Sequence, residues 1–446
     1  MRDRPVAGFA TPDRIGEGFN GMTHQVALTI IAAVKGDHVQ QLAQLLETMG
    51  RDAANNPLLP FARLSGVHYA RLLLLDEAHD LSGASIAPQL IFMSDVDAPL
   101  DRRFDELVDL GGAGIDSIYC HCEAYPAGGL LTREQRMSYL RAHIVQADAV
   151  YVNTIGRTVQ QIHQEALLRE AIEDFLDRNK HEWPNRAPEQ IRAAIQAFVD
   201  GDDQLRWARK PADQPGLVWQ IKDWLDLVAI PLVLLLLLPA IIVALPFYVA
   251  LLRLHELRDK AQRAAPDEPH IQELASLEDR SIQNQFSAVG FVKPGQFRLL
   301  TAIGVLWLAR WAARHIFNQA DLGGVKTIHF ARWIFLDGKR RLIFASNYDG
   351  SLESYMDDFI DKLAWGLNAV FSNGVDYPRT NWLIHDGARD EMAFKLFIRA
   401  HQMPTQVWFS AYPNLTALNI ENNARIREGL SGVMTAAATE DWLRRL

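Results

Sequence analysis

The stretch VHYARLLLLD (67–76) returns far along the chain as IHFARWIFLD (328–337). Both runs hold a histidine, an alanine, an arginine, a leucine and an aspartate at the same spacing, so that His68 corresponds to His329 and Asp76 to Asp337. Each run has the length and apolar content of a buried strand. The repetition raises the question of whether the chain holds two copies of one folding unit.

The correspondence continues beyond these strands. QLIFMSDVDAPLDRRFDELVD (89–109) matches RLIFASNYDGSLESYMDDFID (341–361), which pairs Ser94 with Ser346 and Asp97 with Asp349. Matches in the same order, separated by changes in loop length, are typical of an internal duplication.

Each copy predicts the element order βαββαβ. In the first copy we expect strands at 25–35, 67–75, 89–94 and 115–122, and helices at 38–52 and 99–110. In the second copy we expect strands at 286–293, 326–336, 341–346 and 367–373, and helices at 296–318 and 352–365. A helix, a strand and a second helix then follow in each copy, at 131–146, 149–154 and 158–177, and at 388–402, 406–411 and 415–429.

The predicted fold class is therefore α+β, with two ferredoxin-like repeats packed as an intramolecular pseudo-dimer. The predicted domains are an N-terminal tail (1–22), repeat 1 (23–177), a helical insertion (178–284), repeat 2 (285–430) and a C-terminal tail (431–446).

Composition limits the classes of function. The chain of 446 residues is 49% hydrophobic and has a formal net charge of −9, which argues against a nucleic-acid-binding surface because such a surface is basic. Its two cysteines indicate a reducing compartment, and its first residues lack the apolar run of a secretory signal.

The insertion contains an apolar segment (227–252) without a charged or amide side chain, long enough to enter a bilayer. Prolines interrupt it and aromatic residues lie near its ends, as at membrane interfaces. These residues are Pro231, Pro239, Pro246, Trp219, Trp224 and Tyr248. Two arms joined near Pro239 predict a re-entrant hairpin, whereas the alternative is one kinked spanning helix.

Basic residues flank the apolar segment on both sides, at Arg206, Arg209, Lys210 and Lys222 and at Arg253, Arg258, Lys260 and Arg263. This pattern fits two cytoplasmic flanks, so we expect a membrane location with both soluble halves in the cytoplasm. The apolar stretch at 299–319 is interpreted either as a second membrane contact or as the first helix of repeat 2 packed on its sheet.

Polar residues of the repeated strands are candidates for catalysis or ligand binding. They are His68, His329, Arg71, Arg332 and Asp349. Strand alternation predicts that each histidine and the arginine three residues later face opposite sides of the sheet.

The run SNYDGS (346–351) ends a predicted strand and begins a helix. Its Ser346, Asn347, Asp349, Gly350 and Ser351 form either a structural turn or a site for a phosphate or lipid headgroup at the helix start.

The run CHCE (120–123) would place its cysteines on one strand face and His121 and Glu123 on the other, and the second copy has SNGV instead. No metal site is predicted there.

The inferred pairing of two βαββαβ copies resembles the dimeric α/β-barrel group, which includes chlorite dismutases and dye-decolourising peroxidases. The resemblance implies haem as a cofactor, with His315 or His401 as axial ligand, although the peroxidase Gly-x-x-Asp-Gly motif is represented only by SNYDG (346–350), which lacks the first glycine. The HFAR and SNYDGS runs are also similar to those of an uncharacterised family of bacterial membrane-associated proteins.

Three functions are consistent with the sequence. The first is a membrane-anchored protein whose paired halves bind a lipid, an apolar small molecule or a protein partner. The second is a membrane-associated oxidoreductase, with haem as its possible cofactor. The third is a homo-oligomer that shapes the membrane. Membrane lipid is the partner that all three share.

Overall fold

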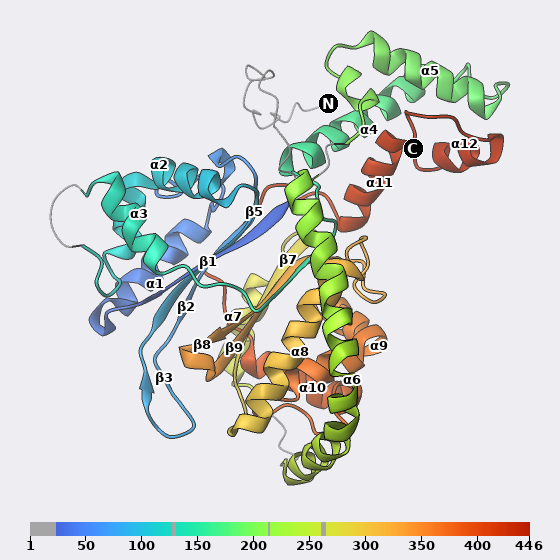
Figure 1. The fold of residues 1–446 in the computed structure, drawn as a ribbon. Coiled ribbons are helices and arrows are strands. Elements are labelled where there is room, and N and C mark those ends of the chain that lie inside the picture. The colour runs from blue at the N-terminus through green and yellow to red at the C-terminus, as the bar shows by residue number, and fades with distance from the viewer. Residues whose placement is uncertain (1–23, 127–130, 213–214, 260–264) are drawn as a thin grey trace.

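The computed structural model describes residues 24–126, 131–212, 215–259 and 265–446. The predicted N-terminal tail (1–22), Lys260 and Arg263 lie outside this part of the chain. The described residues form a mixed α+β fold with two four-stranded antiparallel sheets, two small hairpins and one long apolar helix (Figure 1).

The first sheet has the strand order β1-β5-β2-β12. Its strands are β1 (Gln25–Ala33), β2 (Val67–Leu75), β5 (Gln89–Asp97) and β12 (Val407–Ser410). The repeated run forms β2, which is buried along its whole length because it lies between two other strands and has helices on one side and the second sheet on the other.

The second sheet has the strand order β6-β8-β9-β7. Read from the other edge, this is the order of the first sheet, with β7, β9, β8 and β6 in the places of β1, β5, β2 and β12. Its strands are β6 (Ala149–Val152), β7 (Gln283–Phe291), β8 (Ile328–Leu336) and β9 (Arg341–Asp349). The second copy of the repeated run forms β8, at the position equivalent to β2.

Each sheet takes its fourth strand from the other half of the chain. Strand β6 lies in the first half but pairs with β8, and β12 lies in the second half but pairs with β2. The two halves are therefore joined by backbone hydrogen bonds as well as by side-chain packing.

The predicted strands at 115–122 and 367–373 are wrong. Their residues mostly continue the helices α2 (Leu100–Tyr119) and α9 (Leu352–Phe371). Helix α2 is kinked at Gly112, and after the kink the buried side chains of Ile115, Ile118 and Tyr119 keep helical spacing, so this apolar run packs as a helix face. Among the described residues, single bridges such as Val34 to Cys122 form beside the outer edge of β1 in place of a paired strand.

Helices cover the outer faces of both sheets, while the inner faces pack on each other. Helices α1 (Val39–Gly50) and α2 cover the first sheet, and α8 (Gln296–His315) and α9 cover the second (Figure 1). Between the sheets, Leu73 and Met93 pack with Ile334 and Ile343.

The remaining elements complete the chain. The helices are α3 (Arg133–Ala142), α4 (Val159–Arg178), α5 (Pro188–Gly201), α7 (Glu268–Leu277), α10 (Glu391–His401), α11 (Ala417–Glu428) and α12 (Ala436–Leu443). The hairpin strands are β3 (Ala78–His79), β4 (Ser85–Ile86), β10 (Thr380–Asn381) and β11 (His385–Asp386), and the 3-10 turns are Gly36–His38, Phe61–Arg63, Arg206–Arg209, Asp337–Lys339 and Gly387–Arg389. Helices α4, α5, α11 and α12 share a separate small core that includes Ile172, Ile195 and Trp442.

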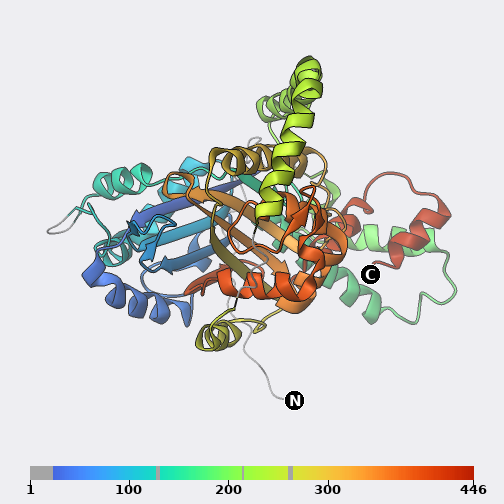
Figure 2. The ribbon, with the colours of Figure 1, turned by 90° about the horizontal axis from the view of Figure 1, so that it is seen from below.

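Helix α6 (Leu217–Arg258) contains the apolar segment and is the one described helix long and apolar enough to cross a membrane. Its most apolar window has a mean hydropathy of 3.0 and is 0% buried by the rest of the chain. Figure 2 shows α6 projecting from the body of the molecule. This exposed apolar surface is unusual for a helix in water and fits contact with lipid.

Both ends of α6 contact the same helix, α8. Near the start of α6, Asp223 pairs with Arg314 at 2.5 Å, and just beyond its end Asp259 pairs with Arg298 at 2.6 Å. At 1.5 Å per residue, the path along α6 between these aspartates is about 54 Å, whereas the path along α8 between the arginines is about 24 Å. Helix α6 therefore bows away from α8 and returns to it, and its three internal prolines weaken the helix at intervals along this path.

Candidate functional site

Arg71 of β2 crosses from the first sheet to the second. Its Nη1 donates to Phe286 O at 2.8 Å and to Ser287 Oγ at 2.9 Å, and its Nη2 donates to Ser346 O at 2.8 Å and to Asn347 Oδ1 at 2.5 Å. The residue is 3% exposed. These bonds join the two sheets in the centre of the molecule.

Arg332 of β8 makes the reciprocal contacts. Its Nη1 donates to Leu28 O at 2.8 Å and to Thr29 Oγ1 at 3.1 Å, and its Nη2 donates to Ser94 O at 3.0 Å and to the carboxylate of Asp95. The two predicted arginines thus lie in one cluster between the sheets. Each one donates hydrogen bonds to backbone and side-chain oxygens of the opposite sheet.

The charges of this cluster do not balance. Two guanidinium groups share one carboxylate, Asp95, because the corresponding residue of the second sheet is Asn347. Burial lowers the pKa of Arg71 to about 10, an effect that Asp95 opposes and Arg332 reinforces. With a pKa of about 10, Arg71 stays protonated at neutral pH, and Asp95 is the carboxylate that faces the two guanidinium groups.

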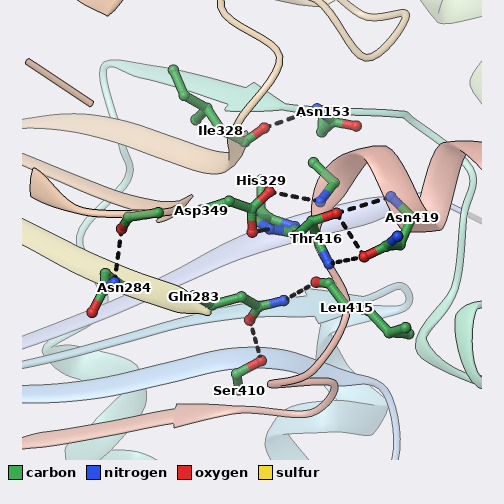
Figure 3. Close-up of polar contacts among 12 residues, drawn as sticks. Asn153, Gln283, Asn284, Ile328, His329, Asp349, Ser410, Leu415, Thr416 and Asn419 are labelled. Carbon is green, nitrogen blue, oxygen red and sulfur yellow. Dashed lines mark hydrogen bonds and ion pairs between the residues drawn. The ribbon is translucent and has the colours of Figure 1, made fainter. Parts of the chain in front are cut away.

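His329 and Asp349 form a buried pair at the end of β9 (Figure 3). The His329 Nε2 lies 2.7 Å from Asp349 Oδ1, and Asp349 Oδ2 accepts a hydrogen bond from Ala417 N at 2.7 Å. Ala417 is the first residue of α11, so the carboxylate binds one of the free amides at a helix N-terminus.

His68 and Asp97 repeat this arrangement in the other half. The His68 Nε2 lies 2.9 Å from Asp97 Oδ1, and Asp97 Oδ2 accepts from Val159 N at the start of α4 at 3.1 Å. Each pair thereby fixes the N-terminus of a helix that follows one of the exchanged strands.

The prediction that His68 and Arg71 face opposite sides of the sheet is wrong. A bulge at His68 shifts the register of β2 against β5, and a matching bulge at His329 shifts β8 against β9. The His68 ring lies 5.1 Å from Phe330 of the second sheet, so it faces the same inter-sheet space as Arg71. An extra residue in a strand turns the neighbouring side chains in this way.

The space beside the two histidines is narrow. Tyr412, in the loop before α11, has its Oη 2.8 Å from His68 Nδ1. The corresponding position in the loop before α4 is Thr154, which has a smaller side chain. The cavity lined by both histidines, Tyr412 and Thr154 has a volume of about 20 Å³. That volume suits about one water molecule, so the space beside the pair is too small for a substrate.

The SNYDGS run is engaged in structural contacts. Ser346 Oγ bonds Tyr355 Oη at 2.6 Å, Gly350 O accepts from Asn284 Nδ2 at 2.8 Å, and Ser351 Oγ caps α9 by accepting from Ser354 N at 3.2 Å. Gly350 has a φ of 84°, which a residue with a side chain rarely adopts. With Asn347 bound to Arg71 and Asp349 to His329, the run forms a turn that links the sheet to α9.

The CHCE run follows the end of α2 instead of lying on a strand. Cys120 is exposed and Cys122 is buried, so the two thiols do not share an accessible face. Burial raises the pKa of Cys122 to about 12. Among the described residues, no group of three or more histidine, cysteine or acidic side chains is placed to hold a metal ion.

The residues implied by the peroxidase resemblance do not fit haem. His401 Nδ1 bonds Phe397 O of its own helix at 2.8 Å, and the cavity beside this histidine has a volume of about 50 Å³, far below the roughly 300 Å³ of small cofactor sites. His315 packs beside Trp311 and lies 3.8 Å from Asp223. The space beside His401 is therefore too small for haem.

The predicted interfacial aromatics differ in their contacts. Trp219 lies under Arg314 at 5.2 Å, Trp224 is 60% exposed, and Tyr248 packs against Phe297 of α8 at 5.3 Å. The segment 299–319 largely forms α8, whose Leu306 packs on the second sheet, while Leu308 is exposed.

An apolar cavity large enough for a ligand lies between α8, α9 and the edge of the second sheet. Its volume is about 370 Å³, and nearly all of its lining is apolar, from residues such as Leu308, Phe317, Trp333 and Leu363. This volume falls within the range of small-molecule sites. Sequence reasoning did not find the cavity, because the apolar faces of α8 and α9 look the same whether they pack tightly or leave a space.

Helix α6 is connected to one wall of this cavity. Leu383, at the tip of the β10–β11 hairpin, lines the cavity, and its backbone N donates to Glu256 Oε1 of α6 at 2.7 Å. Glu256 is 0% exposed and also accepts from Trp382 N at 2.9 Å and Thr380 Oγ1 at 3.0 Å. The end of the apolar helix therefore positions a residue of the cavity wall.

Comparison of the chain with protein-family models, curated proteins and solved structures gives no match.

Proposed function

We propose that this protein is anchored in a membrane by α6 and binds an apolar ligand, a lipid or another lipophilic molecule, in the cavity between α8 and α9. The observation that carries the proposal is the position of this cavity. It lies under α8, the helix to which both ends of α6 attach, and Leu383 of its wall is held by α6 itself. A lipophilic molecule in the bilayer would reach the cavity without crossing water.

The exposed apolar surface of α6 supports the anchor. Leu235, Leu236 and Val243 are each more than 60% exposed, in a segment without any charge. Because both ends of α6 return to α8, a re-entrant insertion that leaves both halves on one side is favoured over a single span. We therefore propose that both halves lie in the cytoplasm.

We further infer that the body arose by duplication and that its halves form an intramolecular pseudo-dimer related to ferredoxin-like pairs. The matched strand orders and the reciprocal contacts of Arg71 and Arg332 support this origin. The His68–Asp97 and His329–Asp349 pairs occupy corresponding positions, which also supports it. On this view the histidines and arginines hold the two halves together, and ligand binding takes place elsewhere.

Cysteine labelling of sealed vesicles tests the sidedness of the two halves. Cys120 is an exposed thiol in the first half, and Met392→Cys in a Cys120→Ser background places one in the second half, at a position 66% exposed. A membrane-impermeant maleimide is expected to label both thiols in inside-out vesicles and neither in right-side-out vesicles. Cys122 is buried with a raised pKa and adds no background, which the Cys120→Ser protein checks. Labelling of the two halves from opposite sides would establish a single span.

Filling the cavity tests ligand binding. Ala309 and Ala312 of α8 line the cavity, and replacing both by Trp is expected to lower the amount of co-purified lipophile, measured by native mass spectrometry from nanodiscs, by about tenfold or more. Ala437→Trp, on the exposed side of α12, is the control and is expected to retain the ligand. A wild-type protein that carries and takes up no lipophile would contradict the proposed function.

A further inference from the structure

The β10–β11 hairpin presents large apolar side chains to solvent at its tip. The tip consists of Trp382, Leu383 and Ile384, of which Trp382 is 51% exposed and Ile384 is 39% exposed. Trp382 and Leu383 have φ angles of 54° and 66°, a left-handed conformation that residues with side chains rarely adopt. A single exposed apolar residue is ordinary, but a strained turn that displays a tryptophan and an isoleucine together indicates a contact outside the chain.

Helix α6 fixes the position of this tip. The buried carboxylate of Glu256 accepts from Trp382 N at 2.9 Å and from Leu383 N at 2.7 Å, so it holds the two residues in their left-handed conformation. The guanidinium of Arg253, on the same helix, lies 5.4 Å from the ring of Trp382 and donates to Asn381 Oδ1. The tip is therefore attached to the last turns of α6 by backbone and side-chain contacts.

The contact with Arg253 gives the depth of the tip relative to a bilayer. Arg253 is the first charged residue after the apolar segment (227–252), so it marks the level at which α6 leaves the hydrocarbon. Trp382 lies beside Arg253 and thus at the membrane–water interface. Tryptophan is enriched at this level because its ring is apolar and its N–H is polar.

The other end of the apolar segment shows a similar contact. Asp226 is the last charged residue before the segment, and its backbone O accepts from Trp311 Nε1 of α8 at 3.2 Å. Trp311 and Trp382 come from different elements of the body, yet each adjoins a residue that bounds the apolar segment. The face of the body that carries α8 and the hairpin therefore lies at the level where both ends of the segment enter the bilayer.

We propose that the β10–β11 hairpin is a second membrane contact, in which Trp382 and Ile384 lie among the lipid headgroups beside the end of α6. The face formed by α8 and the hairpin then rests on the bilayer surface. This inference rests on the proposed function, because it takes α6 as the anchor, and it names the lipid interface as the partner of this surface.

The contact also gives a lipophilic molecule a route to the cavity. Leu308 of α8 and Trp365 of α9 line the cavity and are 45% and 50% exposed, so the cavity reaches the surface of the body. Leu383 of the hairpin tip lines the same cavity. Once the hairpin lies in the interface, this side of the cavity adjoins lipid instead of water.

Depth-dependent quenching tests the hairpin contact. Ile384→Cys in a Cys120→Ser background keeps Trp382 and the contacts of Glu256, and its thiol carries an NBD fluorophore in the full-length protein in phosphatidylcholine vesicles. Cys122 is buried with a raised pKa and adds no background. Lipids with a nitroxide near the headgroup are expected to quench this probe more strongly than lipids with a nitroxide near the chain end. Trp382→Cys, labelled in the same way, provides a second position and is expected to give the same order.

Two further labelled positions calibrate the measurement. Leu236→Cys lies in the middle of the apolar segment, where the wild-type residue is 71% exposed, and the deep nitroxide is expected to quench it more strongly than the shallow one. Thr48→Cys lies on the exposed side of α1, which covers the first sheet on the side away from α8 and α9. Neither nitroxide is expected to quench the probe at this position.

The outcomes separate the hairpin contact from the anchor. If the probe at Leu236→Cys is quenched by the deep nitroxide while both hairpin probes resemble Thr48→Cys, the hairpin contact is overturned and the anchor stands. Cross-linking of Ile384→Cys chains to each other without quenching would assign the tip to a second copy and also overturn the lipid contact. Absence of quenching at Leu236→Cys would overturn the anchor in the proposed function, and this inference with it.

Discussion

Replacing Asp95 by Ala is expected to lower the free energy of unfolding by about 3–5 kcal/mol, because it removes the one carboxylate from a buried cluster of two arginines. Asp95 is 4% exposed and accepts from Arg332 Nη2 and from Asn347 Nδ2. Without it, Arg71 and Arg332 would keep two buried positive charges between the sheets. The change is measured by denaturant unfolding in one fixed detergent, against the wild-type protein.

The second half of the chain supplies the control for this prediction. Asn347 occupies the corresponding position opposite Arg71 and is neutral, so Asn347→Ala removes hydrogen bonds without removing an anion. Its expected cost is about 1–3 kcal/mol. If both variants lost the same stability, the ion pair with Arg332 would not be what holds this cluster, and hydrogen bonding alone would explain it.

The repeated strands were the most predictable part of the fold. Buried apolar runs bounded by turn residues identify β2 and β8, and the second copy checks the first. The strands β1, β2, β5, β7, β8 and β9 and the first residues of the covering helices were therefore predicted to within a few residues, but α2 and α9 extend beyond their predicted ends at 110 and 365. The apolar runs at 115–122 and 367–373 were misread because a short apolar run fits either a strand or the buried face of a helix. Only packing against the sheet decides between them.

The exchange of strands between the sheets was not predictable. Strands β6 and β12 were expected as additions to their own repeats, and their sequences, AVYV and VWFS, carry no information on which partner they choose. The partner of each strand depends on the path of the chain before it, which determines the sheet that the strand reaches. The bulges at His68 and His329 were not predicted, for a similar reason. A bulge is a mismatch between two paired strands, so the sequence of one strand alone does not reveal it.

The catalytic or ligand-binding role of the repeated polar residues stays a prediction. The repetition of His68, Arg71 and Asp97 marked residues that lie buried between the two halves, but it did not show that their partners include backbone groups and helix ends. The apolar cavity has no such signal.

Charges placed in the middle of α6 are expected to release the protein from membranes. Leu235 and Leu236 are 63% and 71% exposed and lie close to the centre of the apolar segment. An aspartate near the centre of a bilayer helix costs about 2.5–3.5 kcal/mol, so Leu235→Asp with Leu236→Asp is expected to cost about 5–7 kcal/mol of insertion. That cost corresponds to a decrease of about four to five orders of magnitude in the membrane-bound ratio, which liposome flotation measures.

Two charges at the start of α6 provide the matched comparison. Leu217 and Val218 are 76% and 68% exposed but precede the apolar segment, so Leu217→Asp with Val218→Asp is expected to leave flotation nearly unchanged. The contrast separates insertion from general adhesion, because both pairs remove the same kind of surface and add the same charge. If the central pair still floated like wild type, the middle of α6 would not be inserted in the bilayer, and another surface of the protein would hold it on the liposome. Loss of flotation by the central pair alone would place the middle of α6 in the hydrocarbon while its two ends stay on α8.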